Sequence, residues 1–224
     1  MSQPLPLGVL VSGGGTNLQS IIDACEAGRT GASVAVVISN RASAFGLERA
    51  RKHGIATAHI PVGQTGSADW EAADARQVEV LQAHGVQLVC LAGYMRKIGP
   101  RLLTAFPGAI MNIHPALLPA FPGVEVQWTA AEYGVRIAGC TVHFADEEFD
   151  RGPIIIQAAV PVMPGDTGDD VAHRILEQEH RVYPQAIKWF AAGRLSIANR
   201  HVMVQDAPPP LLDGTAIISP GLDP

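Results

Sequence analysis

The sequence has little of what marks several classes of protein. Its 224 residues include only three cysteines, Cys25, Cys90 and Cys140, which are far apart and form no CxxC pair. An odd, scattered set excludes a disulfide framework, so we expect three buried free thiols. No run approaches the ~18 apolar residues that a membrane helix needs, and the chain does not open with the charged and apolar segments of a secretory signal. A cytoplasmic protein without a membrane partner is therefore expected.

Cations are also scarce. Lys and Arg number 16 against 21 Asp and Glu, which gives a formal net charge of −5. A protein that coats nucleic acid needs an excess of cations, so no nucleic-acid partner is expected. A small anionic ligand stays open, because backbone N–H groups can bind phosphate within an acidic protein.

Short apolar runs alternate with helical patterns along most of the chain. The expected strands are 7–11, 33–38, 57–60, 88–91, 109–113, 137–144 and 154–160. Helices between successive strands predict an α/β fold, with a doubly wound, mostly parallel sheet and helices on both of its faces. Only ~9 residues join the last two strands, too few for a parallel crossover, so this pair is expected to be antiparallel and the sheet mixed.

The domain organisation is expected to be simple. No internal repeat or linker is visible, so residues 1–204 are predicted to form a single domain. Residues 205–224, which include Pro208-Pro209-Pro210, are interpreted as a loosely held, Pro-rich C-terminal tail.

The loop Ser12–Asn17 (SGGGTN) joins the first apolar run to a helix. Backbone N–H groups at a helix N-terminus favour an anion. A dinucleotide site fits poorly, because Leu18 replaces the third glycine of that fingerprint and Asn40 stands where an acidic residue is expected. A phosphomonoester is the better ligand, and a simple tight turn is the alternative.

Asn112 and His114 stand two residues apart at the end of an expected strand, so their side chains project to the same side. An amide and an imidazole placed in this way can stabilise a developing oxyanion, although a structural hydrogen-bonded pair is the alternative. Asp150 precedes Gly152-Pro153, a turn that could aim its carboxylate into a cleft and favour a protonated His114. The alternative for Asp150 is a solvated position on an exposed acidic turn.

Metal binding is not expected. Cys140 and His143 have the spacing of half a zinc site, but on a strand they face opposite sides of the sheet. A serine nucleophile is not expected either, since the chain has no Gly-x-Ser-x-Gly turn.

Four segments, in this order, resemble the folate-dependent formyltransferase family. They are Ser12–Leu18 (SGGGTNL), Ala92–Arg96 (AGYMR), Asn112–Pro119 (NIHPALLP) and Asp150–Pro153 (DRGP). The likeness covers about residues 7–195 and implies a Rossmann-like formyltransferase fold, 10-formyltetrahydrofolate as co-substrate, direct transfer and no metal. The opening loop and Gln178-Glu179-His180 point to the branch whose acceptor is glycinamide ribonucleotide, a step of de novo purine biosynthesis.

The resemblance also implies site residues. The catalytic residues would be Asn112, His114 and Asp150. The ribonucleotide would be bound through its phosphate by Gly15, Thr16 and Asn17, and also by Glu179. The folate would be bound by Met95, Arg96, Lys97, Ile98, Asn112, Ala145, Asp146, Glu147 and Glu148.

The chain departs from the family pattern at a few positions. Glu125 stands where many members have histidine, Ala116 replaces a frequent serine, and no basic residue that would help to bind folate is found near Asp69-Trp70-Glu71. These departures bear on substrate affinity rather than on the reaction. Two alternatives stay open, a formyltetrahydrofolate hydrolase and a non-catalytic folate- or nucleotide-binding relative, and so does a homodimer.

Overall fold

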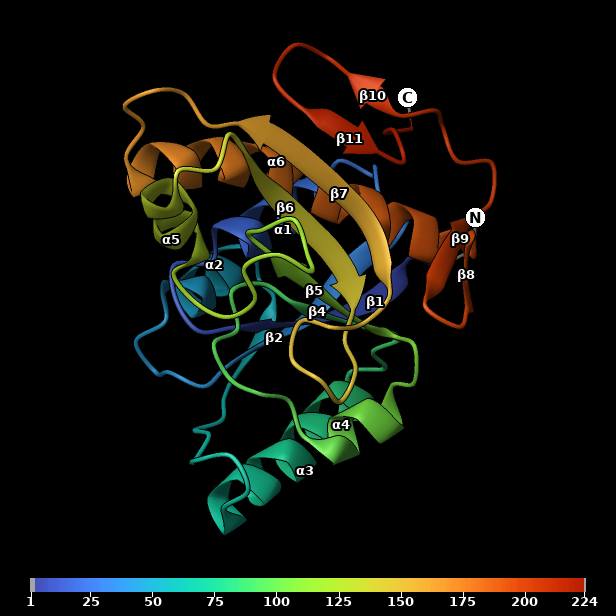
Figure 1. Cartoon of the computed structure of the whole chain (residues 1–224). Coiled ribbons are helices and arrows are strands. Elements are labelled where there is room, and N and C mark those ends of the chain that lie inside the picture. Colours follow the sequence, from blue (N-terminus) through green and yellow to red (C-terminus); the bar gives the residue numbers. More distant parts are fainter. Residues whose placement is uncertain (1–2, 224) are drawn as a thin grey trace. The chain divides into compact units, whose positions relative to one another are not determined.

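The computed structural model describes residues 3–223, which fall into two compact units, the first ending at Asn112 and the second beginning at Ile113 (Figure 1). The strands of the first unit are β1 (Leu5–Val11), β2 (Ala32–Ser39), β3 (Ala56–His59), β4 (Leu88–Leu91) and the first part of β5 (Ile110–His114). Its helices are α1 (Thr16–Glu26), α2 (Phe45–Lys52), α3 (Ala68–Ala83) and α4 (Pro100–Ala105).

The strands of the first unit lie in the order β3-β2-β1-β4-β5, and each neighbouring pair is parallel. The chain moves outward from β1 to β3 and then returns to the other side of β1 for β4. Because parallel crossovers are right-handed, this reversal puts α1 and α2 on one face of the sheet and α3 and α4 on the other. The carboxyl ends of β1 and β4 therefore meet at a switch point, where open α/β sheets bind ligands.

Sequence periodicity accounts for the core of the first unit. The side chains of Leu7, Val9 and Leu10 on β1 are fully buried, as near-continuous apolar strands of parallel sheets require. Leu18 and Ile21 give α1 one buried face. Ser67 begins α3 by accepting a hydrogen bond from the backbone N–H of Trp70.

The second unit begins within β5 and is largely antiparallel. It contains α5 (Val126–Tyr133), β6 (Ile137–Phe144), β7 (Ile154–Pro161), α6 (Gly168–Ala191), β8 (Leu195–Ala198), β9 (His201–Val204), β10 (Leu211–Leu212) and β11 (Ile217–Ser219). β6 pairs with β7 antiparallel, as the short connection predicts. The amphipathic α6, begun by a capping box of Thr167 and Asp170, contacts β6, β7 and α5. The predicted α/β class with a mixed, mostly parallel sheet is therefore confirmed.

The C-terminal segment differs from the expected loosely held tail. β11 pairs antiparallel with β7, and β10 pairs with β11. Ile218 on β11 is fully buried. The division into a domain 1–204 and a tail 205–224 stays a prediction. Among residues 3–223, no helix combines the length and apolar composition that crossing a membrane requires.

Candidate active site

The first candidate site lies at the carboxyl ends of β1 and β4. The loop after β1 leads directly into α1, and Gly15 at the start of this helix has φ 69°. A Cβ at Gly15 would come within 2.8 Å of the Cα of Gly46, so both the backbone angle and the lack of space require glycine. No side chain of the described residues caps α1, and the N–H groups of its first turn are the usual anion donors of a helix.

Ser12 connects the loops of this site. Its Oγ donates to Oδ1 of Asn40 at 2.6 Å and accepts from the backbone N–H of Met95 at 2.8 Å. Arg49 on α2 adds a hydrogen bond from Nε to the carbonyl oxygen of Gly14 at 2.8 Å. The loops that follow β1, β2 and β4 are therefore held together by side-chain contacts.

A pocket of about 240 Å³ opens between these loops. Its lining includes Gly15, Thr16 and Asn17, the residues predicted to hold a phosphate, together with Met95 and Arg41. Arg41 is the charged residue of this lining and was missed by the sequence reasoning. Its position two residues after β2 was the available signal.

The predicted folate segment Met95–Ile98 is fixed by α3. Nε1 of Trp70 donates to the carbonyl oxygen of Lys97 at 3.1 Å, and Nε2 of Gln77 donates to the hydroxyl of Tyr94 at 2.8 Å. Burial raises the pKa of Tyr94 to about 12 despite the bond from Gln77, so this hydroxyl is neutral. Met95, Arg96 and Lys97 are exposed, whereas Ile98 is buried.

The second candidate site lies at the end of β5, in the second unit. Nδ1 of His114 is 3.4 Å from Oδ2 of Asp150, with the two side chains only 4% and 2% exposed. The same Oδ2 accepts the backbone N–H of Gly123 at 3.1 Å. The carboxylate of Asp150 is therefore buried against an imidazole, and the alternative of a solvated turn is wrong.

Both ring nitrogens of His114 have a partner. Nε2 lies 2.8 Å from the carbonyl oxygen of Phe121, which can only accept, so Nε2 carries a hydrogen. Nδ1 faces the carboxylate of Asp150, which also only accepts when ionised. The imidazole ring is therefore held between Phe121 and Asp150.

A second histidine faces Asp150. Nε2 of His143 on β6 is 3.9 Å from Oδ1 of Asp150, and Nδ1 of His143 donates to the carbonyl oxygen of Phe144 at 2.9 Å. Burial lowers the pKa of His143, although the bond to Phe144 and the charge of Asp150 oppose the shift. His143 is therefore neutral near pH 7. Sequence reasoning gave it a core role only, because its approach to Asp150 depends on the fold of the loop after β6.

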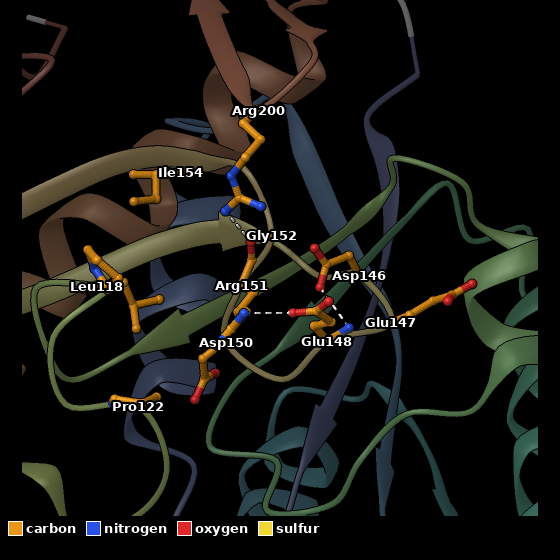
Figure 2. A pocket seen from close by; sticks show the side chains of 11 residues that line it. Leu118, Pro122, Asp146, Glu147, Glu148, Asp150, Arg151, Gly152, Ile154 and Arg200 are labelled. Carbon is orange, nitrogen blue, oxygen red and sulfur yellow. Dashed lines mark hydrogen bonds and ion pairs between the residues drawn. The ribbon is translucent and has the colours of Figure 1, made fainter.

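A pocket of about 840 Å³ adjoins Asp150 (Figure 2). Its charged lining residues are Asp146, Glu147, Glu148, Asp150, Arg151 and Arg200. Three of the predicted folate residues are thus brought to this pocket, whereas Ala145 is not part of its lining. Glu179 lies on α6, buried, where its charge adds to the burial that raises the pKa of the Cys140 thiol.

The cysteines do not form a site. Cys90 and Cys140 are buried, as expected, whereas Cys25 is half-buried and accepts a hydrogen bond from Thr30. Within residues 3–223, no group of three or more His, Cys, Asp or Glu side chains is arranged to hold a metal ion.

A family model described as formyl transferase matches residues 7–187. The chain belongs to the formyl transferase family. This formyl transferase is similar to the phosphoribosylglycinamide formyltransferase of Escherichia coli (strain K12), with 45% identity over 189 residues, 84% of this chain and 88% of the relative. It is an enzyme, and the family resemblance predicted from its four sequence segments is confirmed.

Two solved structures have a similar fold. The crystal structure of glycinamide ribonucleotide transformylase 1 from Symbiobacterium toebii is 56% identical, with a TM-score of 0.87, and the match covers 92% of this chain and 96% of that one. A formyltetrahydrofolate deformylase from Pseudomonas syringae is 27% identical, with a TM-score of 0.84, and the match covers 92% of this chain and 67% of that one.

Proposed function

We propose that this formyl transferase moves the formyl group of 10-formyltetrahydrofolate to the amine of glycinamide ribonucleotide, in purine biosynthesis. The observation that carries the proposal is the similarity to a phosphoribosylglycinamide formyltransferase and to a glycinamide ribonucleotide transformylase. Each match covers most of this chain and most of the relative. The products are formylglycinamide ribonucleotide and tetrahydrofolate.

The reaction needs donors for a negatively charged oxygen. The amine attacks the formyl carbon, the carbonyl oxygen becomes an oxyanion, and the bond from the formyl carbon to N10 of the folate then breaks. Asn112 and protonated His114, two residues apart on β5, donate to the oxyanion. The 2.8 Å contact of His114 Nε2 with the carbonyl oxygen of Phe121 supports this role, because an oxyanion can replace that oxygen as acceptor.

Asp150 keeps His114 charged. Its carboxylate, buried 3.4 Å from Nδ1, favours the imidazolium over the neutral ring. Through water, Asp150 also passes the proton lost by the attacking amine to the leaving N10. Removal of one donor of this kind typically costs on the order of 10²-fold in rate.

The proposed substrate contacts form a ribonucleotide set and a folate set. Gly15, Thr16 and Asn17 bind the ribonucleotide phosphate, which the first turn of α1 and the 240 Å³ pocket support. Glu179 also binds the ribonucleotide. The folate is held by two segments and Asn112. Those segments are residues 95–98 and 145–148.

A hydrolase is the second candidate, because the deformylase of Pseudomonas syringae has a similar fold. The transferase has the stronger support, since its match is 56% identical against 27% and covers 96% of the relative against 67%. A non-catalytic relative is disfavoured by the pairing of His114 with Asp150. The location in the cytoplasm, the absence of a metal and a homodimer stay predictions.

The test is a formyl-transfer assay of the purified chain with 10-formyltetrahydrofolate, with and without glycinamide ribonucleotide. Tetrahydrofolate is followed by absorbance, and the formylated ribonucleotide by mass. We expect turnover only with the acceptor present. Release of formate without acceptor would identify a hydrolase, and the absence of both reactions would leave a binding protein.

A further inference from the structure

The hairpin β8–β9 lies outside the segment that the family model matches, yet it reaches the loop that carries Asp150. Ala198 pairs with His201, so Asn199 and Arg200 form the two-residue turn between the strands. Asn199 has φ 57°, a left-handed conformation that asparagine tolerates in such turns. His201 pairs with Ile154 at the start of β7, which brings the turn beside the end of the Asp150 loop.

Arg200 contacts this loop directly. Its guanidinium donates to the carbonyl oxygen of Arg151 at 2.5 Å, as drawn in Figure 2. Arg151 is the residue after Asp150, so the bond holds the peptide on the carboxyl side of Asp150. Arg200 and Asp150 also line the same pocket.

The backbone of Asp150 needs such support. Its φ of 55° is in the left-handed region, where a residue other than glycine is strained. Such a conformation persists only where the surrounding contacts hold it. The conformation matters here because it turns the carboxylate toward Nδ1 of His114 and the N–H of Gly123.

The contacts around Asp150 differ in strength: Gly152 and Pro153 are packed and hydrogen-bonded, whereas the ion pair of Arg151 is exposed. On the carboxyl side, Gly152 packs so closely on the carbonyl oxygen of Phe144 that a Cβ would not fit, and the N–H of Phe144 donates to Pro153 at 2.9 Å. The ion pair of Arg151 with Glu148 has both side chains about two-thirds exposed, and exposed pairs contribute little. Between these contacts, the carbonyl oxygen of Arg151 is bound by Arg200.

We propose that Arg200 is a positioning residue, which holds the Arg151 peptide and through it aims the Asp150 carboxylate at His114. The inference rests on the proposed formyl transfer for its kinetic consequence. The rival role is direct binding of an anionic part of a substrate, such as the folate carboxylates, by the Arg200 guanidinium in the pocket. A positioning residue changes kcat, whereas a substrate ligand changes KM.

The kinetic test compares Arg200→Gln, Arg200→Lys and the control Arg136→Gln, an exposed arginine ahead of β6 in the same unit. For Arg200→Gln we expect kcat to fall ~5-fold, as for loss of one exposed charge-assisted hydrogen bond, with KM within twofold for both substrates. Arg200→Lys keeps a charged donor, whereas glutamine keeps only a neutral one, so Arg200→Lys should recover most of kcat. The control should match the parent. A rise of the folate KM at constant kcat would overturn the proposal.

A double-mutant cycle tests whether the effect passes through Asp150. In an Asp150→Asn background, Arg200→Gln should cause no further loss of kcat, because the carboxylate that it positions is gone. Multiplicative losses would show that Arg200 acts independently and would refute the inference.

Hydrogen exchange gives a readout that needs no activity. The N–H of Gly123 is bound by the Asp150 carboxylate, so Arg200→Gln should speed its exchange several-fold while Arg136→Gln leaves it unchanged. Unchanged exchange at Gly123 would overturn the positioning role. An inactive parent chain in which Arg200→Gln still speeds this exchange would refute the proposed function and leave the positioning role standing.

Discussion

Replacement of Asp150 by asparagine isolates the charge of the buried carboxylate. The side chains have nearly the same shape, and the amide oxygen can still accept the N–H of Gly123, which Oδ2 now accepts at 3.1 Å. What disappears is the attraction between the carboxylate and an imidazolium at His114, 3.4 Å away. The reaction should therefore slow with only a limited effect on folding.

The separation of the two groups sets the scale of the effect. At 3.4 Å and an effective dielectric constant of about 20, two unit charges attract by about 5 kcal/mol before any relaxation. A neutral hydrogen bond from the asparagine and rearrangement of nearby dipoles recover part of this energy. If about half of this attraction is lost from the transition state, formyl transfer slows ~100-fold.

Single-turnover formyl transfer with both substrates saturating is the decisive measurement, because it removes binding and product release. Asp206→Asn is the matched control, since Asp206 is an exposed aspartate that also has a positive φ, 53°. We expect ~100-fold slower transfer for Asp150→Asn, KM values within a few fold of the parent, and no change for the control. A folded Asp150→Asn protein with near-parent single-turnover rates would refute the reasoning.

Three further outcomes are expected. Thr16→Asp should raise the KM for the ribonucleotide ~10-fold or more, because the new carboxylate repels the phosphate, and should leave the KM for the folate little changed. The neutral Thr16→Asn variant should change neither KM by much. Equal effects of Thr16→Asp on both KM values in steady-state assays would remove the phosphate assignment. Burial lowers the pKa of His143 below its value in the unfolded chain, so the contribution of His143 to the free energy of unfolding is fully present above pH ~6.5. As the pH drops from there toward the pKa of His143 in the folded protein, the free energy of unfolding should fall by at most about 1.4 kcal/mol per pH unit. Urea unfolding at several pH values should show this slope in the parent and not in His143→Gln. Burial raises the pKa of Cys25 and Cys140, so a thiol reagent at pH 8 should label Cys140 only on unfolding and Cys25 slowly, and rapid labelling of the native protein would contradict their burial.

The strands that the sequence revealed are those with continuous burial. The expected run 88–91 coincides with β4, and the run 137–144 coincides with β6. The strands β8 to β11 were missed because they are two to four residues long and mostly exposed, so they have no apolar pattern of their own. They exist through pairing with β7 or with each other, which a local pattern cannot reveal.

The sequence likewise pointed to some residues of the site and not to others. His114 could be assigned from its place at a strand end, and the turn after Asp150 correctly suggested a carboxylate aimed inward. The alternative of a solvated position on an exposed acidic turn is wrong, because the side chain of Asp150 is 2% exposed. His143 and Arg200 were not expected beside Asp150, because each meets the Asp150 loop through strand pairing or loop closure.

The pairing of β11 with β7 has a practical consequence for aggregation. A chain shortened at Gln205, where the sequence predicts a loosely held tail, would lose the hydrogen bonds that Ile217–Ser219 make along Gln157–Ala159. It would also uncover the apolar surface that Ile218 buries. An open strand edge beside exposed apolar surface is a template for pairing with other chains. We therefore expect removal of these residues to promote self-association through an open sheet edge, so affinity tags belong at the opposite terminus.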